Sequence, residues 1–131
     1  MFVTDTHSLV WYFNGKHSSL SSKVLSAFQR AESSEIVIYI PSVVLWETAL
    51  LEKRGRINLK HGFENWSKKV LSKTGFAIAH LETEIIAKSV GYSFNDDPFD
   101  AAIVATAIEV QSPLITKDVA ITESNLVEIY W

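Results

Sequence analysis

Three aspartates crowd the stretch "NDDPFDAAIVATA", residues 95–107, just before the chain becomes almost wholly apolar. A helix that enters a core gains from one capping carboxylate, and the positive end of its dipole tolerates a second. Asp97 precedes Pro98, as expected for an N-cap followed by proline at the first helical position. Asp100 then lies one turn further, beside apolar Ile103, where an ionised carboxylate is costly. An acid in that position needs a proton, a cationic partner or a metal ion.

Three further acids lie after predicted strands or on the apolar face of a predicted helix. Asp5 directly follows "MFVT", Asp118 directly follows "PLITK", and Glu47 lies in "VVLWETALLEKR" among residues that are apolar at helical spacing. Each has a simpler explanation, because Asp5 and Asp118 also suit a cap or a turn and Glu47 also suits an ion pair. However, Lys117 is the only Lys or Arg near these acids in the sequence. A hard divalent cation held by oxygen ligands explains the four acids together.

Strands and helices alternate in the hydrophobic pattern. We predict strands near residues 1–4, 35–40, 75–81, 112–118 and 125–131, and helices near 5–13, 20–33, 43–54, 82–92 and 97–110. Ser42 is the expected N-cap of the third helix, and Gly55 is its expected end. The basic residues between add one or two helices. This order predicts one domain, residues 1–131, built as a three-layer α/β/α sandwich around a parallel sheet of four to five strands. In such folds functional groups gather at the carboxyl ends of the strands.

Charge is segregated along the chain. The net charge is -3, but residues 52–73 carry seven Lys or Arg against Glu52 and Glu64, a local charge of +5. The remaining chain carries five basic and thirteen acidic residues, a charge of -8. A basic segment beside an acidic body would steer a polyanion towards a cation-binding site. A solvated helical surface is the simpler alternative.

Composition excludes several classes of protein. The chain has no cysteine, so disulfides, thiolate zinc sites and a cysteine nucleophile are absent, which suits a reducing cytoplasm. The first residues lack a charged start, and no apolar run approaches the roughly 18 residues that span a bilayer, so we expect no signal peptide and no membrane association. The sequence contains no phosphate-binding glycine loop and no zinc spacing among its four histidines. His7 lies near the expected site, although a surface histidine is the simpler reading of that position.

Four segments of the chain resemble a known family. "VTDTHSLVW", "PSVVLWETALL", "DPFDAAIVATA" and "PLITKD" are similar to the four blocks of PIN-domain ribonucleases, specifically VapC-type toxins of toxin–antitoxin pairs. The resemblance covers essentially the whole chain. It implies that the catalytic and metal-binding acids are Asp5, Glu47, Asp100 and Asp118. Asp100 is chosen over Asp97 because the third acid of the family stands three residues before the "IxATA" pattern. Thr116 and Asp97 would support these acids.

The resemblance also implies an activity and partners. The activity is Mg²⁺-dependent or Mn²⁺-dependent endonucleolytic cleavage of RNA that leaves 5′-phosphate and 3′-hydroxyl ends. The partners are the RNA, a VapB-type antitoxin whose tail lies across the catalytic groove, and a second copy of the chain. Lys53, Arg54, Arg56 and Lys60 would bind RNA. Apolar surfaces for the protein partners would be lined from the set Leu9, Val10, Trp11, Leu45, Trp46 and Leu50, most of which also suit the core.

One departure and one alternative accompany this hypothesis. Relatives often have a histidine or arginine just before "DPFD", whereas this chain has Asn95 and Asp96, so we expect no local cation there for the scissile phosphate. The alternative is a catalytically silent PIN-like module that binds an antitoxin or RNA. A phosphoacceptor receiver fits poorly because Glu47 lies within a helix, and a haloacid-dehalogenase-type phosphatase fits poorly because position 7 is histidine and not aspartate.

Overall fold

The computed structural model describes residues 1–131 and consists of short parallel strands connected by helices. The strands are β1 (Phe2–Thr4), β2 (Ile38–Pro41), β3 (Phe76–Ala79), β4 (Leu114–Ile115) and β5 (Ile129–Tyr130). The helices are α1 (Thr6–Phe13), α2 (Ser22–Glu32), α3 (Ser42–Lys53), α4 (Gly62–Leu71), α5 (Thr83–Ser89), α6 (Pro98–Glu109) and α7 (Val119–Ser124), with a short 3₁₀ turn at His17–Ser19. No helix is both long and apolar enough to cross a membrane.

The first strand of the chain lies at the centre of the sheet. The strand order is β3-β2-β1-β4-β5, and all neighbours are parallel. Val3 pairs with Tyr39 on one side and with Leu114 on the other, while Thr4 pairs with Ile115. This register sets the residues that follow β1 beside those that follow β4, at the same edge of the sheet.

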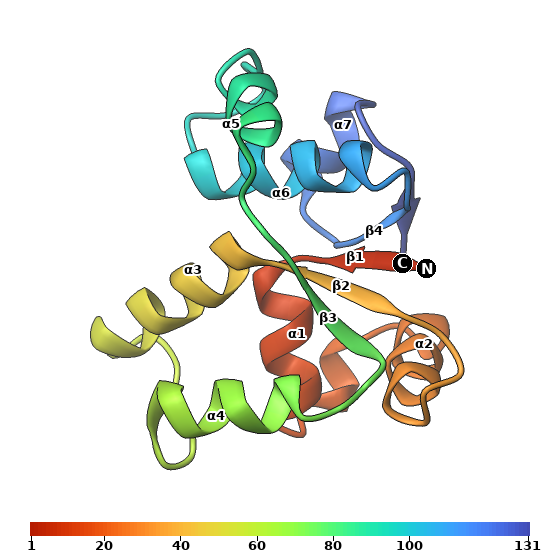
Figure 1. Ribbon diagram of the computed structural model, residues 1–131, viewed down its shortest axis with the longest axis vertical. Coiled ribbons are helices and arrows are strands. Elements are labelled where there is room, and N and C mark those ends of the chain that lie inside the picture. Colours follow the sequence, from red (N-terminus) through yellow and green to blue (C-terminus); the bar gives the residue numbers. More distant parts are fainter.

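Helices cover both faces of the sheet, which confirms the predicted α/β/α architecture. In Figure 1, α1, α2 and α4 lie on one side of the strands and α5, α6 and α7 on the other, while α3 leads away from the end of β2. The strands are apolar because both faces are covered, and Val3, Ile38, Ile40 and Leu114 have no exposed surface. Helix α6 buries six consecutive residues, 102–107, because it packs against α3, α5 and the sheet.

Three local details differ from or refine the predictions. Helix α3 begins at Ser42 itself, so Ser42 is not its N-cap, and the Ser42 hydroxyl instead accepts a hydrogen bond from the Leu81 amide at 3.0 Å. Gly55 follows Arg54, the C-cap of α3, and has φ +69°, as expected for a glycine just past the end of a helix. The basic segment contains one helix, α4. Helix α7 was not predicted, since its six residues bury only Ile121.

One glycine is required by close packing. A side chain at Gly75 would place its Cβ 1.8 Å from the carbonyl oxygen of Ala31, which lies in α2. The Gly75 carbonyl also accepts a hydrogen bond from the Ile38 amide at 2.8 Å, at the start of β2. Only a residue without a side chain allows the turn before β3 to approach α2 this closely.

Candidate active site

The four acids named from the sequence line one pocket of about 340 Å³ at the carboxyl edge of the sheet. Asp5 follows β1, Glu47 lies in the middle of α3, Asp100 lies in the first turn of α6, and Asp118 follows β4 and precedes α7. Asp97, at the start of α6, lines the same pocket. The fold therefore gathers acids from four separate segments around one small cavity.

Asp5 and Asp118 are held through a shared threonine. Asp5 caps α1 by accepting a hydrogen bond from the Ser8 amide at 2.9 Å, and Asp118 caps α7 by accepting one from the Ile121 amide at 2.8 Å. The buried Thr116 hydroxyl donates to the second carboxylate oxygen of Asp5 at 2.6 Å and accepts from the Asp118 amide at 3.1 Å. Thr116 occupies this place because β1 and β4 are neighbours in register. The carboxylates of Asp5 and Asp118 therefore both cap helices and line the acid pocket.

The other acids are fixed by polar neighbours of their own. The Thr6 hydroxyl donates to Oε1 of Glu47. The Asn95 side-chain amide donates to Oδ2 of Asp100 at 2.9 Å, and its oxygen accepts from the Asp97 amide at 3.0 Å. Asp97 is the N-cap of α6, accepting from the Phe99 and Asp100 amides at 2.8 and 3.3 Å. Asn95 therefore positions Asp100 through a neutral amide and not through a cation.

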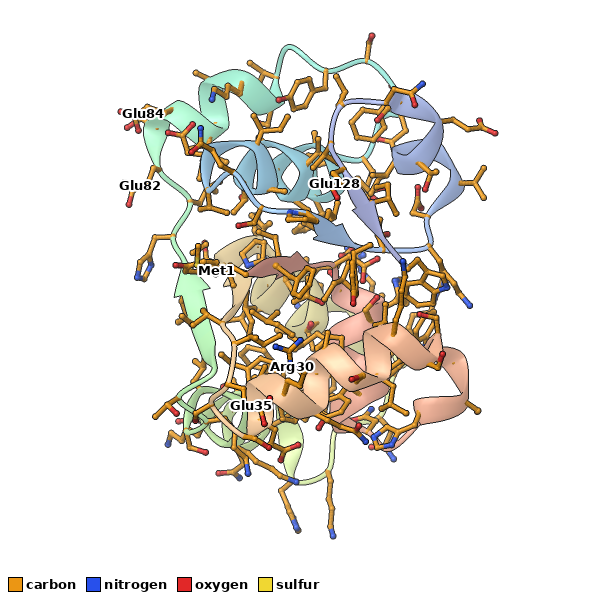
Figure 2. All side chains as sticks on the ribbon, turned by 90° about the vertical axis from the view of Figure 1, so that its right-hand side faces the viewer. Met1, Arg30, Glu35, Glu82, Glu84 and Glu128 are labelled. Atoms are coloured by element: carbon orange, nitrogen blue, oxygen red, sulfur yellow. The ribbon has the colours of Figure 1, made fainter.

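No basic side chain neutralises these acids. The four ion pairs of the structure lie elsewhere, as Arg30 and Glu35 near the end of α2 illustrate in Figure 2. Lys117 lines the pocket, but its ammonium lies over the Trp11 ring, 4.7 Å from the centroid, and makes no ion pair. The clustered carboxylates of the pocket therefore form no ion pair with a Lys or Arg side chain.

The pKa is raised for three of the carboxyl groups, those of Asp5, Glu47 and Asp100. Burial is the largest cause for all three, because it disfavours the charged form. Burial and the charge of Asp97 raise the pKa of Asp100 from 3.8 to about 7, although the Asn95 hydrogen bond opposes this. The pKa of Glu47 is raised by burial, with a hydrogen bond from Thr6 opposing it, and that of Asp5 is raised by burial against the hydrogen bonds from Ser8 and Thr116. A bound cation would favour the ionised form of all three carboxyl groups.

The donor set suits a hard divalent cation. Oδ1 of Asp100 and Oδ2 of Asp118 accept no hydrogen bond from the protein, and neither does Oε2 of Glu47. Carboxylate oxygens are the ligands that Mg²⁺ and Mn²⁺ prefer. In this arrangement no group of three Asp, Glu or His side chains is set to hold one ion. The chemistry and the charge of the pocket fit such an ion.

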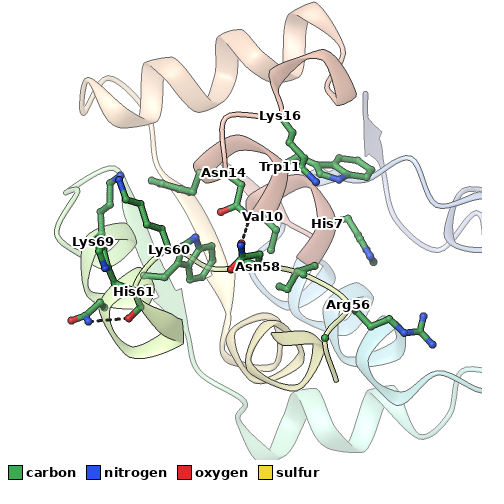
Figure 3. Close-up of a pocket in the computed structure, with 15 residues that line it drawn as sticks. His7, Val10, Trp11, Asn14, Lys16, Arg56, Asn58, Lys60, His61 and Lys69 are labelled. Atoms are coloured by element: carbon green, nitrogen blue, oxygen red, sulfur yellow. Dashed lines mark hydrogen bonds between the residues drawn. The ribbon is translucent and has the colours of Figure 1, made fainter. Parts of the chain in front are cut away.

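The predicted RNA-binding residues fall in different places. Arg56 and Lys60 line a larger groove of about 940 Å³ that borders the acid pocket and shares His7 and Trp11 with it (Figure 3). Arg54 lines another depression, which shares Glu47, Asp97 and Asp100 with the acid pocket. Lys53 lines none of these three cavities. The sequence identified the basic segment, but only the fold divides its side chains between these surfaces.

The six residues predicted to line apolar surfaces differ in their exposure. Leu9 and Val10 are 0% and 4% exposed and belong to the core, so they are not available to a partner. Trp11, Leu45 and Leu50 are partly buried. Trp46 is 59% exposed and packs edge-on against Phe99, with ring centroids 5.1 Å apart. Trp46 is thus the main exposed apolar side chain of that set.

The family model for the PIN domain matches residues 2–123. The chain therefore belongs to the PIN-domain family, as the four sequence blocks indicated, and PIN domains are generally nucleases that act on nucleic acid. No curated protein sequence matches the chain.

Solved structures agree with this assignment in fold. The chain is similar to VapBC2 from Rickettsia felis, bound to a DNA fragment from its promoter, with 16% identity, 98% of this chain and 96% of that chain covered, and a TM-score of 0.69. FitAcB from Neisseria gonorrhoeae has 14% identity, coverage of 100% and 97%, and a TM-score of 0.67. A toxin–antitoxin complex from Klebsiella pneumoniae has 20% identity, coverage of 90% and 87%, and a TM-score of 0.59.

Proposed function

We propose that the chain is a metal-dependent endoribonuclease that acts as the toxin of a toxin–antitoxin pair. The observation that supports this most directly is the pocket of carboxylates, which come from four segments and have no Lys or Arg paired with them. Acids arranged in this way can bind a divalent cation. The cation can then bind a phosphodiester, which the carboxylates alone would repel. Membership of the PIN-domain family supports the same activity.

The residues that would hold Mg²⁺, or Mn²⁺ as a substitute, are Asp5, Glu47, Asp100 and Asp118. When bound, such an ion polarises a phosphoryl oxygen, activates water and stabilises the departing oxygen. Thr116 keeps Asp5 and Asp118 in fixed orientations, and Asn95 does the same for Asp100. Because Thr6 occupies Oε1 of Glu47, Oε2 is left to orient the attacking water and to accept its proton. The water oxygen bonds to phosphorus as the bond to the 3′ oxygen breaks, and the departing 3′ oxygen takes a proton from solvent, which gives 5′-phosphate and 3′-hydroxyl ends.

Cleavage of total RNA by the purified protein tests this function. Wild type, Asp100→Asn and Asp96→Asn are compared with Mg²⁺, with Mn²⁺ and with a chelator. Asp96→Asn is the matched control, because Asp96 is an exposed acid of the same loop and does not line the acid pocket. We expect wild type and Asp96→Asn to cut only with metal and Asp100→Asn not to cut. If folded wild type cuts under none of these conditions, the protein is a binding module and not a nuclease.

The proposed protein partner is an antitoxin that covers the acid pocket. The structural relatives from Rickettsia felis and Klebsiella pneumoniae are toxin–antitoxin complexes, which supports a partner of this kind. A basic side chain on that partner would satisfy the unpaired carboxylates. Co-expression of the chain with a candidate antitoxin should abolish metal-dependent cleavage, and undiminished cleavage by a stable complex would exclude this mode of inhibition.

The second proposed partner is another copy of the chain. Exposed Trp46, resting on Phe99, offers an apolar contact of the kind that protein interfaces bury. We expect sedimentation to give the mass of a dimer, and Trp46→Ser to lower the dimer fraction. A wild-type protein that sediments as a monomer at micromolar concentration would contradict this proposal.

A further inference from the structure

The groove beside the acid pocket has a charge opposite to that of the whole chain. The chain carries a net charge of -3, yet no Asp or Glu lines this groove of about 940 Å³. Its cationic and imidazole side chains are His7, Lys16, Arg56, Lys60, His61 and Lys69. They come from α1, from the segment that follows it, from the loop between α3 and α4, and from α4. Such a concentration of one sign of charge in a concave surface attracts a polyanion.

The positive side chains stand on more than one side of the groove. In Figure 3, Lys60, His61 and Lys69 lie on one side, Lys16 lies beside Trp11 on another, and Arg56 and His7 lie on a third; His7 also lines the acid pocket. Between them Asn14 donates a hydrogen bond to the Asn58 carbonyl at 3.1 Å, so amide groups lie between the charges. A strand that lies in the groove would meet cations along its phosphates and amides along its bases.

Trp11 stands where the groove meets the acid pocket. Trp11 and His7 line both cavities, and their ring centroids are 5.8 Å apart. Trp11 is only partly buried, and Lys117 lies over its ring from the lining of the acid pocket. An accessible aromatic ring within a positive groove is the combination that single-strand binding proteins use, with bases stacked on rings and phosphates on cations.

We propose that this groove binds a short single-stranded stretch of nucleic acid, with one base against Trp11, and delivers the adjoining phosphodiester to the acids. The delivery step rests on the proposed nuclease function, whereas the binding itself does not. A duplex keeps its bases stacked on one another and would leave Trp11 without a partner. A base is uncharged and can lie beside the carboxylates, while an acidic peptide side chain at the same junction would face like charge.

Two double variants test the role of charge without requiring cleavage. Arg56→Ala/Lys69→Ala removes two cations that line the groove, whereas Lys23→Ala/Lys68→Ala removes two that do not. The pairs are matched because Lys68 and Lys69 are neighbours on α4 and both double variants lose the same charge. Binding of a fluorescent, unstructured 12-nucleotide RNA is measured by anisotropy in chelator at several salt concentrations. The groove pair should lower the slope of log K against log salt by about 1.4, and the control pair should leave it unchanged.

Trp11 is tested with a damaging and a conservative variant. Trp11→Leu should weaken binding of the same RNA about five-fold or more, while Trp11→Phe, which keeps a ring, should retain most of the affinity. Thermal unfolding of both variants establishes that they fold. A duplex of the same sequence should bind more weakly than the single strand and should not respond to Trp11→Leu.

The outcomes separate this inference from the proposed function. Equal salt slopes for the two double variants, or equal affinities for Trp11→Leu and wild type, overturn the groove assignment even if the wild type cleaves RNA with metal. If the groove variants weaken binding as expected but wild type cleaves nothing, the groove assignment stands and the nuclease proposal fails. If a 12-residue polyglutamate peptide binds in a groove-dependent manner and the RNA does not, the groove belongs to an acidic peptide and the proposal is wrong.

Discussion

Asp100 offers a test of the carboxylate cluster that does not depend on activity. In the folded protein the pKa of Asp100 is raised from 3.8 to about 7, chiefly by burial and then by the charge of Asp97. A raised pKa means that the folded state binds the proton more tightly than the unfolded state does, so stability falls as the pH rises between these two values. Above about pH 7 Asp100 is ionised in the folded protein, and the free energy of unfolding is lowered by the full unfavourable energy of that charge. Asp100→Asn should therefore stabilise the metal-free protein.

The size of the effect follows from the two pKa values. A rise from 3.8 to about 7 corresponds to about 4 kcal/mol for a fully buried group, and because Asp100 is only partly buried, solvent screening reduces this to about 1–2 kcal/mol. The asparagine oxygen still accepts the hydrogen bond from Asn95, so no partner is lost. Urea unfolding with chelator at pH 8 should show this gain, and the melting temperature should rise by about 5 °C. At pH 4 the gain should nearly vanish.

Asp96→Asn is the control for this test, and two results would contradict the reasoning. Asp96→Asn removes an exposed carboxylate four residues earlier and should leave stability unchanged at both pH values. If Asp100→Asn is less stable than wild type at pH 8 in chelator, the carboxylate is compensated by a contact that this structure lacks. If its gain is the same at pH 4 and pH 8, the effect is not electrostatic.

Four other predictions concern a hydrogen bond, a close packing contact, a helix cap and metal binding. Thr116→Val should lower the free energy of unfolding in urea by about 2–3 kcal/mol, because it leaves the Asp118 amide without an acceptor and Oδ2 of Asp5 without a donor, while Thr116→Ser should retain stability and activity. Gly75→Ala should cost about 3 kcal/mol in the same assay, since its Cβ would meet the Ala31 carbonyl, and a neutral result would contradict the packing of α2 on this turn. Asp97→Ala should cost about 1 kcal/mol through loss of the α6 cap, whereas Asp97→Asn should cost less than half of that. Millimolar Mg²⁺ should raise the melting temperature of wild type but not of Asp5→Asn, and an equal rise in both would place the ion elsewhere.

The positions of the main strands and helices were predictable because their residues carry strong local patterns. The strand at residues 35–40 is a nearly unbroken apolar run, as expected when both faces are covered, and α6 begins with an N-cap and proline that mark its start. The four acids were predictable because three of them sit where strands end or helices begin, which are the points that parallel sheets bring together. Helix α7 lacked such a pattern, since only one of its residues is buried.

The contacts that complete the site were not predictable from local patterns. Asn95 was noted only as a departure from the family pattern, and its bond to Asp100 depends on the path of the whole loop before α6. Asp97 was correctly named as a cap and was expected to support the acids, but only the structure shows that its charge raises the pKa of Asp100. The division of Arg54 from Arg56 likewise depends on how α3 ends, because Gly55 turns the chain between them. These features are set by long-range packing.

The central position of β1 has a consequence for the biogenesis of the protein. Strand β1 pairs on one side with β4, and Thr116, which follows β4, bonds to Asp5 across 111 residues of chain. A nascent or truncated chain that ends before β4 has one side of its central strand unpaired and lacks Thr116 and Asp118 altogether. Because such long-range pairing forms late, the acid pocket is assembled only after β4 and Asp118 have been made. Chains that end before Asp118 are therefore expected to be inert.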